Sequence, residues 1–588
     1  MLFRSFLKNN KIDFKVMSRR LNISEILCRI MVNRGITSDD SIVSFINPST
    51  DKLFDPKLMK DLDNGVNIIR HKILENKKIR IVGDYDVDGI ISTYLLYRGL
   101  TECGANVDYK IPHRVLDGYG INKNIIETAK QEGIDTIITC DNGIAAVEQI
   151  EYAKSLGMTC IITDHHDVPF KEESDGSRTL IIPNADAIIN CKQVDCGYPF
   201  KLLCGAGVVF KFIQVLYEQM GKSKDEANVF IGYVAIATVC DVVDLVGENR
   251  IIVKEGLKII NNTQNIGLKA LINETGIEDK KIGVYHLGFV IGPCLNAAGR
   301  LDDAKKGLKL LLSEDAEEAK SLAKELFELN KKRKDMTLAG VEDAIEIIEK
   351  KGMRKDKILV VYKADLHESI AGIIAGKIRE QYNAPTLILT DAEHGIKGSG
   401  RSIEQYNMFE GLFMCKDLLA KFGGHPMAAG LSMKLENLEK LRECLNAQTS
   451  LTDDDLIPRV YIDIQLPFNN INVSLAEEIE TLEPYGKRNH KPLFAEKNIG
   501  ISKATILGIN KNVLKLKFIS NGGNKLEGIY FGDIEKFRCY LINKFGDEET
   551  IKMFNGVYNN IKLDVTFNVS INEYRGNRNV QVVIGNYR

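Results

Sequence analysis

Residues 79–92, with the sequence IRIVGDYDVDGIIS, decide the fold and the site that we predict for this chain. The stretch opens with a short apolar run, residues 79–82, that has the length and branching of a buried strand. Three aspartates then follow at alternate positions, Asp84, Asp86 and Asp88. Carboxylates just past the carboxyl end of a strand lie where open α/β sheets bind their ligands.

Close carboxylates repel, and this repulsion distinguishes a cation site from an ordinary acidic turn. At about 4 Å and an effective dielectric of about 20, each pair of charges is destabilised by roughly 4 kcal/mol. A chain that gathers three of them is therefore expected to hold a cation. An acidic turn without a ligand is the alternative interpretation, because such turns are common.

The pattern of an apolar run with a polar end recurs twice further along the chain. Residues 136–140 are followed by Asp141, and residues 160–163 are followed by Asp164, His165 and His166. Helical stretches separate the runs. This alternation predicts a parallel, doubly wound α/β sheet with its site along one edge.

The candidate metal ligands are the carboxylates and imidazoles that follow these strands, together with one aspartate that follows the apolar residues 230–239, expected to be a buried helix. They are Asp84, Asp86, Asp88, Asp141, His165, His166 and Asp241. One cation needs only about four to six donors, so this set predicts two ions. Carboxylate and imidazole without thiolate favour Mn²⁺, then Mg²⁺, over zinc. Asp141 is the natural bridging ligand, and two ions about 4 Å apart could generate a hydroxide and hold a phosphoryl oxygen.

Three later segments combine glycines with a cation. Residues 292–300 are expected to form a tight apolar loop that ends in an arginine, which could bind a phosphate or form a structural salt bridge. Residues 395–402 and 421–430 are expected to form Gly-rich loops. Their N–H groups, with Arg401 and His425, suit a phosphate, although either loop alone is also typical of an ordinary turn.

The chain beyond about residue 458 changes character, because strand-like segments alternate with turns and predict a compact β-barrel. Between residues 484 and 517 the only acid is Glu496, and Tyr485, Phe494 and Phe518 are expected to offer stacking faces. Such a surface suits single-stranded nucleic acid, and a generic basic surface is the alternative. The cations of this span are Lys487, Arg488, Lys491, Lys497, Lys503, Lys511, Lys515 and Lys517.

Bulk properties limit the class of protein. The chain has 588 residues, which predicts several domains, and 78 basic against 80 acidic residues exclude an overall basic coat. No apolar run of about 20 residues predicts a membrane span, and residues 1–10 lack an apolar signal core. Twelve scattered cysteines are interpreted as reduced core residues of a cytoplasmic protein, with zinc at Cys191 and Cys196 as the minor alternative.

Several motifs in register resemble the DHH phosphoesterase superfamily. GDYDVDG, TCDNG, TDHH and TVCDVVDL are similar to its metal motifs. HRVLDGYGIN, GPCLNAAGR, GSGRS and GGHPMAAG resemble its single-strand-specific exonuclease branch, the last two marking a DHHA1 domain. LEPYGKRNHKPLF, LGINKNVLKLKF and NEYRGNRNVQV resemble the OB-like domain of that branch. The resemblance covers nearly the whole chain.

The resemblance implies a Mn²⁺- or Mg²⁺-dependent exonuclease that degrades single-stranded DNA in the 5′→3′ direction to mononucleotides, in recombination and repair. It implies catalytic roles for Asp141, His165, His166, Arg401 and His425. A single-stranded-DNA-binding protein and a helicase are the implied partners, and we expect a monomer. The implied DNA-binding positions are Asn296, Arg300, Ser399, Arg401, Ser402, Gly424, His425, Lys487, Arg488 and Lys515. Departures from the family pattern lie at Asp244, Leu366, Ser369, Arg488 and His490.

The resemblance also implies the domain organisation. We expect a helical extension over residues 1–60, a DHH domain over 61–300, a helical linker over 301–354, a DHHA1 domain over 355–455 and an OB-like domain over 456–588. Two other functions stay open. One is another phosphodiesterase of the superfamily, acting on oligoribonucleotides or cyclic dinucleotides, although such branches generally lack the linker and the OB-like domain. The other is a non-catalytic DNA-binding scaffold.

Overall fold

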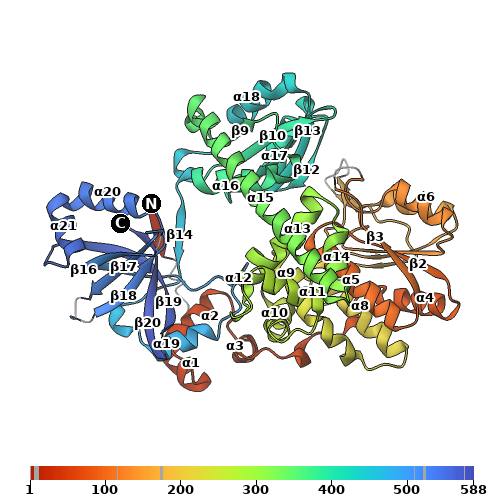
Figure 1. Ribbon diagram of the computed structural model, residues 1–588, viewed down its shortest axis with the longest axis horizontal. Coiled ribbons are helices and arrows are strands. Elements are labelled where there is room, and N and C mark those ends of the chain that lie inside the picture. The colour runs from red at the N-terminus through yellow and green to blue at the C-terminus, as the bar shows by residue number, and fades with distance from the viewer. Residues whose placement is uncertain are drawn as a thin grey trace. The chain divides into compact units, whose positions relative to one another are not determined.

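The computed structural model describes residues 2–5, 12–114, 117–172, 177–508, 510–520, 523, 525–574 and 576–588 (Figure 1). The chain forms two compact units. One is Ser49–Ile457, and the other combines Met1–Pro48 with Pro458–Arg588. Among the helices of the described residues, not one has both the length and the apolar character that a membrane span requires.

The first part of the Ser49–Ile457 unit is built on a parallel sheet of five strands in the order β3-β2-β4-β5-β8. The strands predicted from the apolar runs are present, and β4 is buried along its whole length, as expected for a parallel strand covered on both faces. The strands are β2 (Lys78–Val82), β3 (Asn106–Lys110), β4 (Thr136–Cys140), β5 (Thr159–Thr163) and β8 (Ala187–Ile189).

Helices cover both faces of this sheet, which confirms the doubly wound class. Side chains of the strands alternate between two cores, so that Ile138 packs with one set of helices and Ile137 with the other. The first face carries α4 (Leu62–Leu74), α5 (Val87–Glu102) and α8 (Gly205–Gln219), and the second carries α6 (Lys123–Gln131) and α7 (Val147–Ser155).

A helical layer follows the sheet in the chain. The predicted buried helix is present as α9 (Ile231–Cys240). The segment GPCLNAAGR, expected to be a loop, is instead the helix α13 (Gly292–Leu301). Its glycines serve close packing, since a Cβ at Gly299 would lie 2.2 Å from the carbonyl oxygen of Tyr85. The other elements are α10 (Gly247–Ile260), α11 (Ile266–Glu274), α12 (Val284–His286) and the π-helical turn η4 (Leu287–Ile291).

The predicted linker is a helix pair, α14 (Lys305–Leu312) and α15 (Ala316–Lys350). The long helix α15 contacts α11 and α13 at one end and α16 (Glu368–Tyr382) at the other, so it joins two lobes of one unit (Figure 1).

The second lobe holds a five-stranded sheet in the order β12-β13-β11-β10-β9. The two segments expected to be Gly-rich loops are strands here. Glycines in these strands leave room for side chains of the neighbouring strand. A Cβ at Gly400 would lie 2.7 Å from the side chain of Leu387, its partner on the adjacent strand. The strands are β9 (Leu359–Tyr362), β10 (Thr386–Ala392), β11 (Gly395–Arg401), β12 (Lys421–His425) and β13 (Ala428–Met433).

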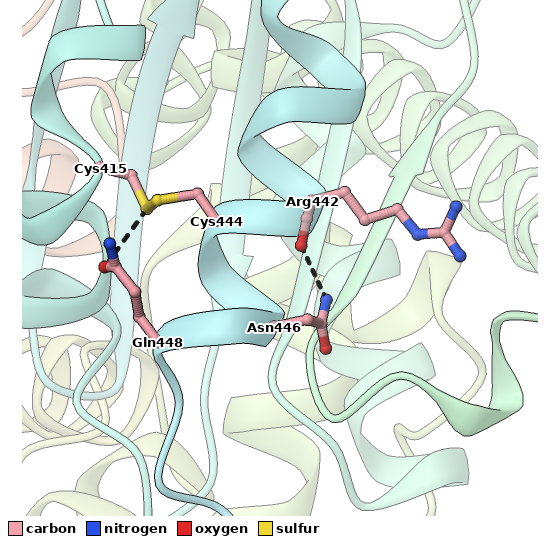
Figure 2. Close-up of a disulfide and its surroundings, with 5 residues drawn as sticks. All are labelled: Cys415, Arg442, Cys444, Asn446 and Gln448. Carbon is pink, nitrogen blue, oxygen red and sulfur yellow. Dashed lines mark hydrogen bonds between the residues drawn. A yellow bond between two sulfur atoms is a disulfide. The ribbon is translucent and has the colours of Figure 1, made fainter.

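The cysteines require a further correction. Cys415, at the end of α17 (Met408–Met414), forms a disulfide with Cys444 on α18 (Leu438–Gln448), as Figure 2 shows. Packing of the two helices brings together residues that are far apart in sequence. The expectation of reduced cysteines is therefore wrong for this pair.

The other unit is a mixed sheet in the order β15-β16-β17-β18-β20-β19, and pairing of β16 with β19 closes it into the predicted barrel. Phe494 and Phe518, expected to offer stacking faces, are fully buried in its core instead. The strands are β15 (Ile464–Gln465), β16 (Phe494–Leu507), β17 (Val513–Ile519), β18 (Lys525–Tyr530), β19 (Lys562–Tyr574) and β20 (Asn577–Tyr587).

The N-terminal helices share that core. Leu27 and Met31 of α2 pack in the same apolar cluster as the barrel strands. The backbone of β1 (Leu2–Ser5) also pairs in parallel with β14 (Arg459–Ile462). The helices are α1 (Phe14–Leu21), α2 (Glu25–Asn33) and α3 (Asp39–Ile46). The division of the chain at residues 60, 300, 354 and 455 remains a prediction.

Candidate metal centre and phosphate-binding residues

The first ligands lie at the junction of β2 and α5. Asp84 follows β2 after one glycine and is buried, while Asp86 caps α5 by accepting a hydrogen bond of 3.0 Å from Gly89 N. Asp88 lies in the first turn of α5 and is also buried. A Cβ at Gly89 would lie 2.5 Å from the carbonyl oxygen of Asp84, so the tight turn requires a glycine there.

Two further aspartates lie where the backbone is strained. Asp141 follows β4 with φ +60°, and Asp241 caps the C-terminus of α9. Val242, the next residue, has φ +57°, a left-handed conformation that a β-branched residue rarely adopts. Such strain persists only where the surrounding fold imposes it, and it clusters at functional sites.

The structure brings all seven predicted ligands together at the carboxyl edge of the sheet. Within each of three groups, candidate ligand atoms lie within 4.8 Å of one another. The groups are Asp84, Asp86 and Asp141; Asp141, His165 and His166; and Asp88, His165 and Asp241. Asp141 belongs to two groups and His165 to two, so the cluster is continuous and is large enough in donors for two cations.

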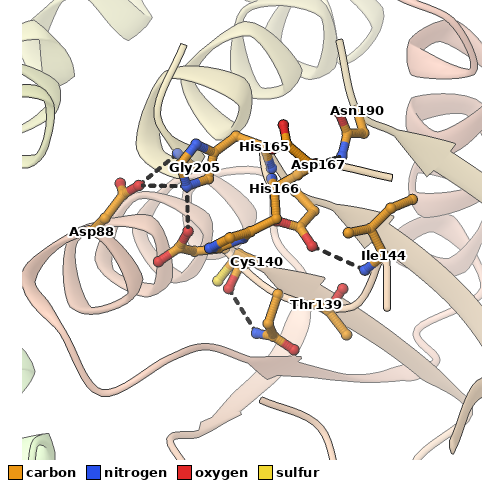
Figure 3. A network of polar contacts seen from close by, with 12 residues as sticks. Asp88, Thr139, Cys140, Ile144, His165, His166, Asp167, Asn190 and Gly205 are labelled. Carbon is orange, nitrogen blue, oxygen red and sulfur yellow. Dashed lines mark hydrogen bonds and ion pairs between the residues drawn. The ribbon is translucent and has the colours of Figure 1, made fainter. Parts of the chain in front are cut away.

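The N-terminus of α8 holds Asp88. Its carboxylate oxygens accept hydrogen bonds of 2.6 Å from Gly205 N and 2.8 Å from Ala206 N. Figure 3 shows Gly205 beside Asp88, with the ring of His165 pointing toward that carboxylate. A Cβ at Gly205 would lie only 2.7 Å from the Asp141 side chain, so a glycine is required at this approach.

The two histidines have different surroundings. His165 Nε2 lies 3.1 Å from Asp141 Oδ1, 3.6 Å from Asp88 Oδ2 and 3.7 Å from Asp241 Oδ2. His166 Nδ1 instead donates to Asp164 Oδ1 at 2.7 Å. Asp164 is buried and is not in any of the three ligand groups. It orients His166, as carboxylates that accept from metal-ligating histidines do.

Burial and mutual repulsion disfavour the charged form of the carboxylates. Burial, then the charge of Asp86, raises the pKa of Asp88 to about 6. Burial, then the charge of Asp88, raises the pKa of Asp241 to about 8. The pKa values of Asp84 and Asp141 are also well above the usual range, because both are buried beside other carboxylates. A bound cation would remove this penalty.

The pKa values of residues 164–166 diverge. Burial lowers the pKa of His165 to about 3, which keeps Nε2 neutral and available as a ligand. Burial also lowers the pKa of His166, but the hydrogen bond to Asp164 and the charges of the surrounding carboxylates together outweigh burial, and the pKa is about 9. For Asp164, burial raises the pKa, but the same hydrogen bond and the charges of the two histidines together outweigh burial, and the pKa falls to about 2.

Two carboxylate oxygens support a cation site independently. Asp84 Oδ1 is buried and has no hydrogen-bond partner among the described residues. Asp141 Oδ1 is also buried and accepts no hydrogen bond from them, although His165 Nε2, itself a candidate ligand atom, lies 3.1 Å away. Buried polar atoms are nearly always satisfied, so each such atom needs an explanation. An oxygen-preferring cation such as Mn²⁺ or Mg²⁺ is the partner that this donor set fits.

Three arginines lie beside the acidic cluster. Arg300, near the end of α13, donates to the carbonyl oxygen of Ser369 at 2.7 Å and thus ties the two lobes together. Burial, then the charge of Arg114, lowers its pKa to about 10, and burial followed by Arg114 also lowers the pKa of Arg401. Arginines that repel one another in a buried setting suit an anion.

The second lobe contributes a glycine-lined cradle. A Cβ at Gly372 of α16 would lie 2.9 Å from Arg401 Nη2 and 3.4 Å from Ser399 Cβ, so the missing side chain makes room for both residues. Gly424 and His425 are exposed on the edge strand β12. Ser402 differs, because it is buried and its Oγ donates to Tyr406 O at 2.7 Å.

Other positions named in the sequence analysis make structural contacts around the site. Asn296 Oδ1 accepts a hydrogen bond of 3.2 Å from Val87 N and so ties α13 to the start of α5. At the departures from the family pattern, Leu366 packs against Gly340, and the Oγ of Ser369 lies 2.7 Å from His367 Nδ1. Leu366 therefore lies against α15, whereas Ser369 lies where Arg300 of α13 reaches the second lobe.

The basic positions of the barrel lie in the other unit. Lys515 Nζ forms an ion pair of 2.7 Å with Glu527 on the neighbouring strand. Arg488 has φ +59° in the turn that Gly486 and Asn489 close by a bridge. Lys487 lies in the same turn.

Two residues of the site were not singled out from the sequence. Arg114 packs over the ring of Tyr85, 4.8 Å from its centroid, beside Arg300 and Arg401. Tyr119 OH donates to Asp141 O at 2.9 Å and lies 3.3 Å from His166. Asp164 was expected at the end of its strand, but the hydrogen bond by which it orients His166 was not predicted. The position of Arg114 after β3, on the same sheet edge as the ligands, was the available signal.

Fold and site together define a phosphoesterase of the DHH class. The DHH family N-terminal domain matches residues 78–238, the DHHA1 domain matches 355–450 and the RecJ OB domain matches 462–586. The chain belongs to the RecJ family of single-stranded-DNA-specific exonucleases. It is 36% identical to the Bacillus subtilis member over 574 residues, which cover 97% of this chain and 69% of that protein.

Other relatives agree. The Salmonella typhimurium single-stranded-DNA-specific exonuclease RecJ is 32% identical over 585 residues, which cover 96% of both chains. The crystal structure of RecJ from Thermus thermophilus in complex with Mn²⁺ matches with a TM-score of 0.80 and 25% identity, covering 100% of this chain and 79% of that one. The predictions of family and fold are confirmed.

Proposed function

We propose that this chain is a two-metal exonuclease that hydrolyses single-stranded DNA from the 5′ end to mononucleotides. The observation that carries the proposal is the continuous set of seven ligands, in which Asp141 and His165 each belong to two groups. Membership of the RecJ family supports the substrate and the direction.

The acidic and imidazole side chains of the site are the proposed metal ligands. Asp84, Asp86, Asp88, Asp141, His165, His166 and Asp241 would hold two Mn²⁺ or Mg²⁺ ions. When bound, these ions would supply Lewis-acid stabilisation of phosphoryl oxygens and lower the pKa of water. Asp141 connects the groups, and Asp164 keeps His166 in its orientation.

The arginines and the second lobe position the phosphates. Arg300 and Arg401 present guanidinium groups near the ligands, and His425 with Gly424 offers donors from the edge of the second sheet. Asn296 and Ser399 are further proposed DNA-binding positions, and the side chain of Asn296 also ties α13 to the start of α5. Ser402 is not included among the proposed DNA contacts, because its hydroxyl is engaged within the lobe.

The barrel unit is proposed to bind the DNA strand outside the active site, with Lys487, Arg488 and Lys515 on its basic surface. A single-stranded-DNA-binding protein and a helicase are proposed partners, and a cytoplasmic monomer is the proposed state. Family membership disfavours a phosphodiesterase for small substrates, and the intact ligand set disfavours a non-catalytic scaffold.

Replacing Asp141 tests the proposal. D141A should abolish Mn²⁺-dependent release of mononucleotides from a 5′-labelled strand, since two of the three ligand groups lose a ligand, while DNA binding is largely kept. D335A, an exposed carboxylate change on α15, should behave as the unchanged chain. Mononucleotide release by D141A in Mn²⁺ would contradict the assignment.

A further inference from the structure

Two stacked aromatic rings are exposed on the lobe that carries the metal ligands. Tyr285 and Phe289 are each 66% exposed, with ring centroids 5.2 Å apart and planes inclined by 23°. A single exposed aromatic residue is ordinary in a folded protein. Two exposed rings stacked on each other instead indicate a binding surface.

The backbone holds these rings in place. They lie four residues apart on the helical segment formed by α12 and η4, while Leu287 and Ile291 between and beyond them are buried. The segment includes a π-helical turn, a feature found often at functional sites. The two rings therefore form one rigid surface, which we call the ring pair.

The helical segment that carries the ring pair packs on the end of α9, next to a candidate ligand. Where η4 meets α9, Cys240 Sγ donates to Leu287 O at 3.5 Å. The next residue, Asp241, is a candidate ligand. Val242 follows it and is 61% exposed, so an apolar side chain is exposed beside this ligand.

The ring pair and the arginines lie at opposite ends of one helical segment. From Tyr285 to Arg300 the chain is helical almost throughout, and fifteen residues at about 1.5 Å each span roughly 22 Å. The charge of Asp86 acts on Arg300, whereas Leu287, between the two rings in the chain, accepts a hydrogen bond from Cys240, the residue before Asp241. Two candidate ligands, Asp86 and Asp241, are therefore neighbours of opposite ends of this segment.

We propose that Tyr285 and Phe289 stack the bases of single-stranded DNA on the 3′ side of the scissile phosphate. This inference rests on the proposed function. If the arginines hold phosphates at the 5′ end, the rest of the DNA strand passes the metal ligands in the direction of Asp241. It then reaches the ring pair within a few nucleotides. Bases suit this surface because every base has a flat π face, and stacking does not depend on sequence. The exposed Lys280 and Lys281 flank the segment and suit the backbone phosphates.

A fluorescence experiment tests the contact without hydrolysis. Oligonucleotides with 2-aminopurine at successive positions from the 5′ end are bound to the full chain in EDTA. We expect quenching at one or two internal positions, lost in Y285A/F289A and kept in Y285F/F289Y, which preserves both rings. Equal quenching at those positions in Y285A/F289A would overturn the proposal, as would a profile without internal quenching.

Kinetics provide the second readout. For Y285A/F289A we expect KM for an ordinary single strand to rise about tenfold or more, because stacking contributes substantially for each base. The rise should vanish on a strand whose internal nucleotides are abasic. L74A, which removes a comparably exposed apolar side chain at the end of α4, should leave KM unchanged. An equal rise on the abasic strand would indicate a structural effect or a protein-binding surface and would overturn the proposal. If the unchanged chain lacked nuclease activity, the proposed function would fail, while the quenching experiment would still report on the ring pair.

Discussion

Asp141 connects the ligand groups of the candidate metal centre. Its position directly after β4 places it in the middle of the sheet edge, and its left-handed backbone turns the side chain between Asp84 and His165. That position could be predicted from the sequence, because carboxyl ends of parallel strands meet at one edge. The left-handed backbone conformation of Asp141 could not be predicted, because contacts with Gly205 and Thr163, which are distant in sequence, impose this conformation.

The residues that the sequence did not reveal act through contacts between distant segments. Tyr119 reaches Asp141 through its hydroxyl group, and Arg114 joins arginines from α13 and from the second lobe. No local pattern encodes such distances. Sequence reasoning therefore finds ligands at strand ends more readily than the residues that orient them.

The pKa shifts predict how stability depends on pH in the metal-free chain. Burial raises the pKa of Asp241 to about 8 from an unfolded value of about 3.9, so the folded state binds an extra proton. The stability from that proton is present at low pH and is lost as pH rises through about 8. His166, with a raised pKa of about 9, acts in the same direction. The lowered pKa of His165 acts in the opposite direction. This effect on stability no longer changes with pH above about 6.5, the pKa of an unfolded histidine.

Thermal unfolding in EDTA should therefore show the free energy of unfolding falling by about 1 kcal/mol per pH unit between about pH 7 and about pH 9. D241N should flatten this slope, and Mn²⁺ should reverse it, since binding requires deprotonated ligands. A melting temperature that stays level or rises over this range in EDTA would contradict the assigned burial of these carboxylates.

At the scale of elements, the glycine-rich segments show where sequence reasoning failed. GPCLNAAGR and the segments 395–402 and 421–430 were expected to be loops, yet they form α13, β11, β12 and β13. Glycine disfavours regular structure locally. Here close approach to Tyr85, Leu387 and Ala428 requires it, and that requirement is a property of tertiary packing.

One glycine offers a direct test of element packing. G205A would place a methyl group 2.7 Å from Asp141 Cβ, where the hydrogen bond to Asp88 prevents α8 from moving away. We expect nuclease activity to fall about 100-fold or more, since a shift of about 1 Å in a catalytic group has such an effect. G500A, where the added methyl group has ordinary contacts, should retain activity. Unchanged kcat and KM in G205A would contradict the described geometry of Asp141.

At the scale of the molecule, the class of each domain could be predicted but not the packing of the N-terminal helices. The strand periodicity after residue 458 predicted the barrel, whereas nothing in residues 13–46 indicated that their apolar faces belong to its core. The same packing explains why Phe494 and Phe518 are unavailable for stacking. The alternation of apolar and polar residues indicates that a side chain is buried. It does not identify the segment of the chain against which that side chain packs.

This shared core predicts separate responses of the two units. L27A, a truncation of a side chain that is 1% exposed, should destabilise the barrel unit by about 2–5 kcal/mol. Calorimetry should resolve one transition that L27A lowers and another that Mn²⁺ raises. V43A, at an exposed position of α3, should move neither. A single transition shifted by both L27A and Mn²⁺ would contradict the division into two units.

The central claim is that side chains from separate strand ends seat two divalent ions with Asp141 between them. The most direct measurement is Mn²⁺ titration by calorimetry combined with electron paramagnetic resonance on the full chain. We predict two ions per chain, a spectrum of magnetically coupled Mn²⁺, and loss of the coupling in D141N. One uncoupled ion per chain, or a coupled spectrum unchanged in D141N, would contradict the account.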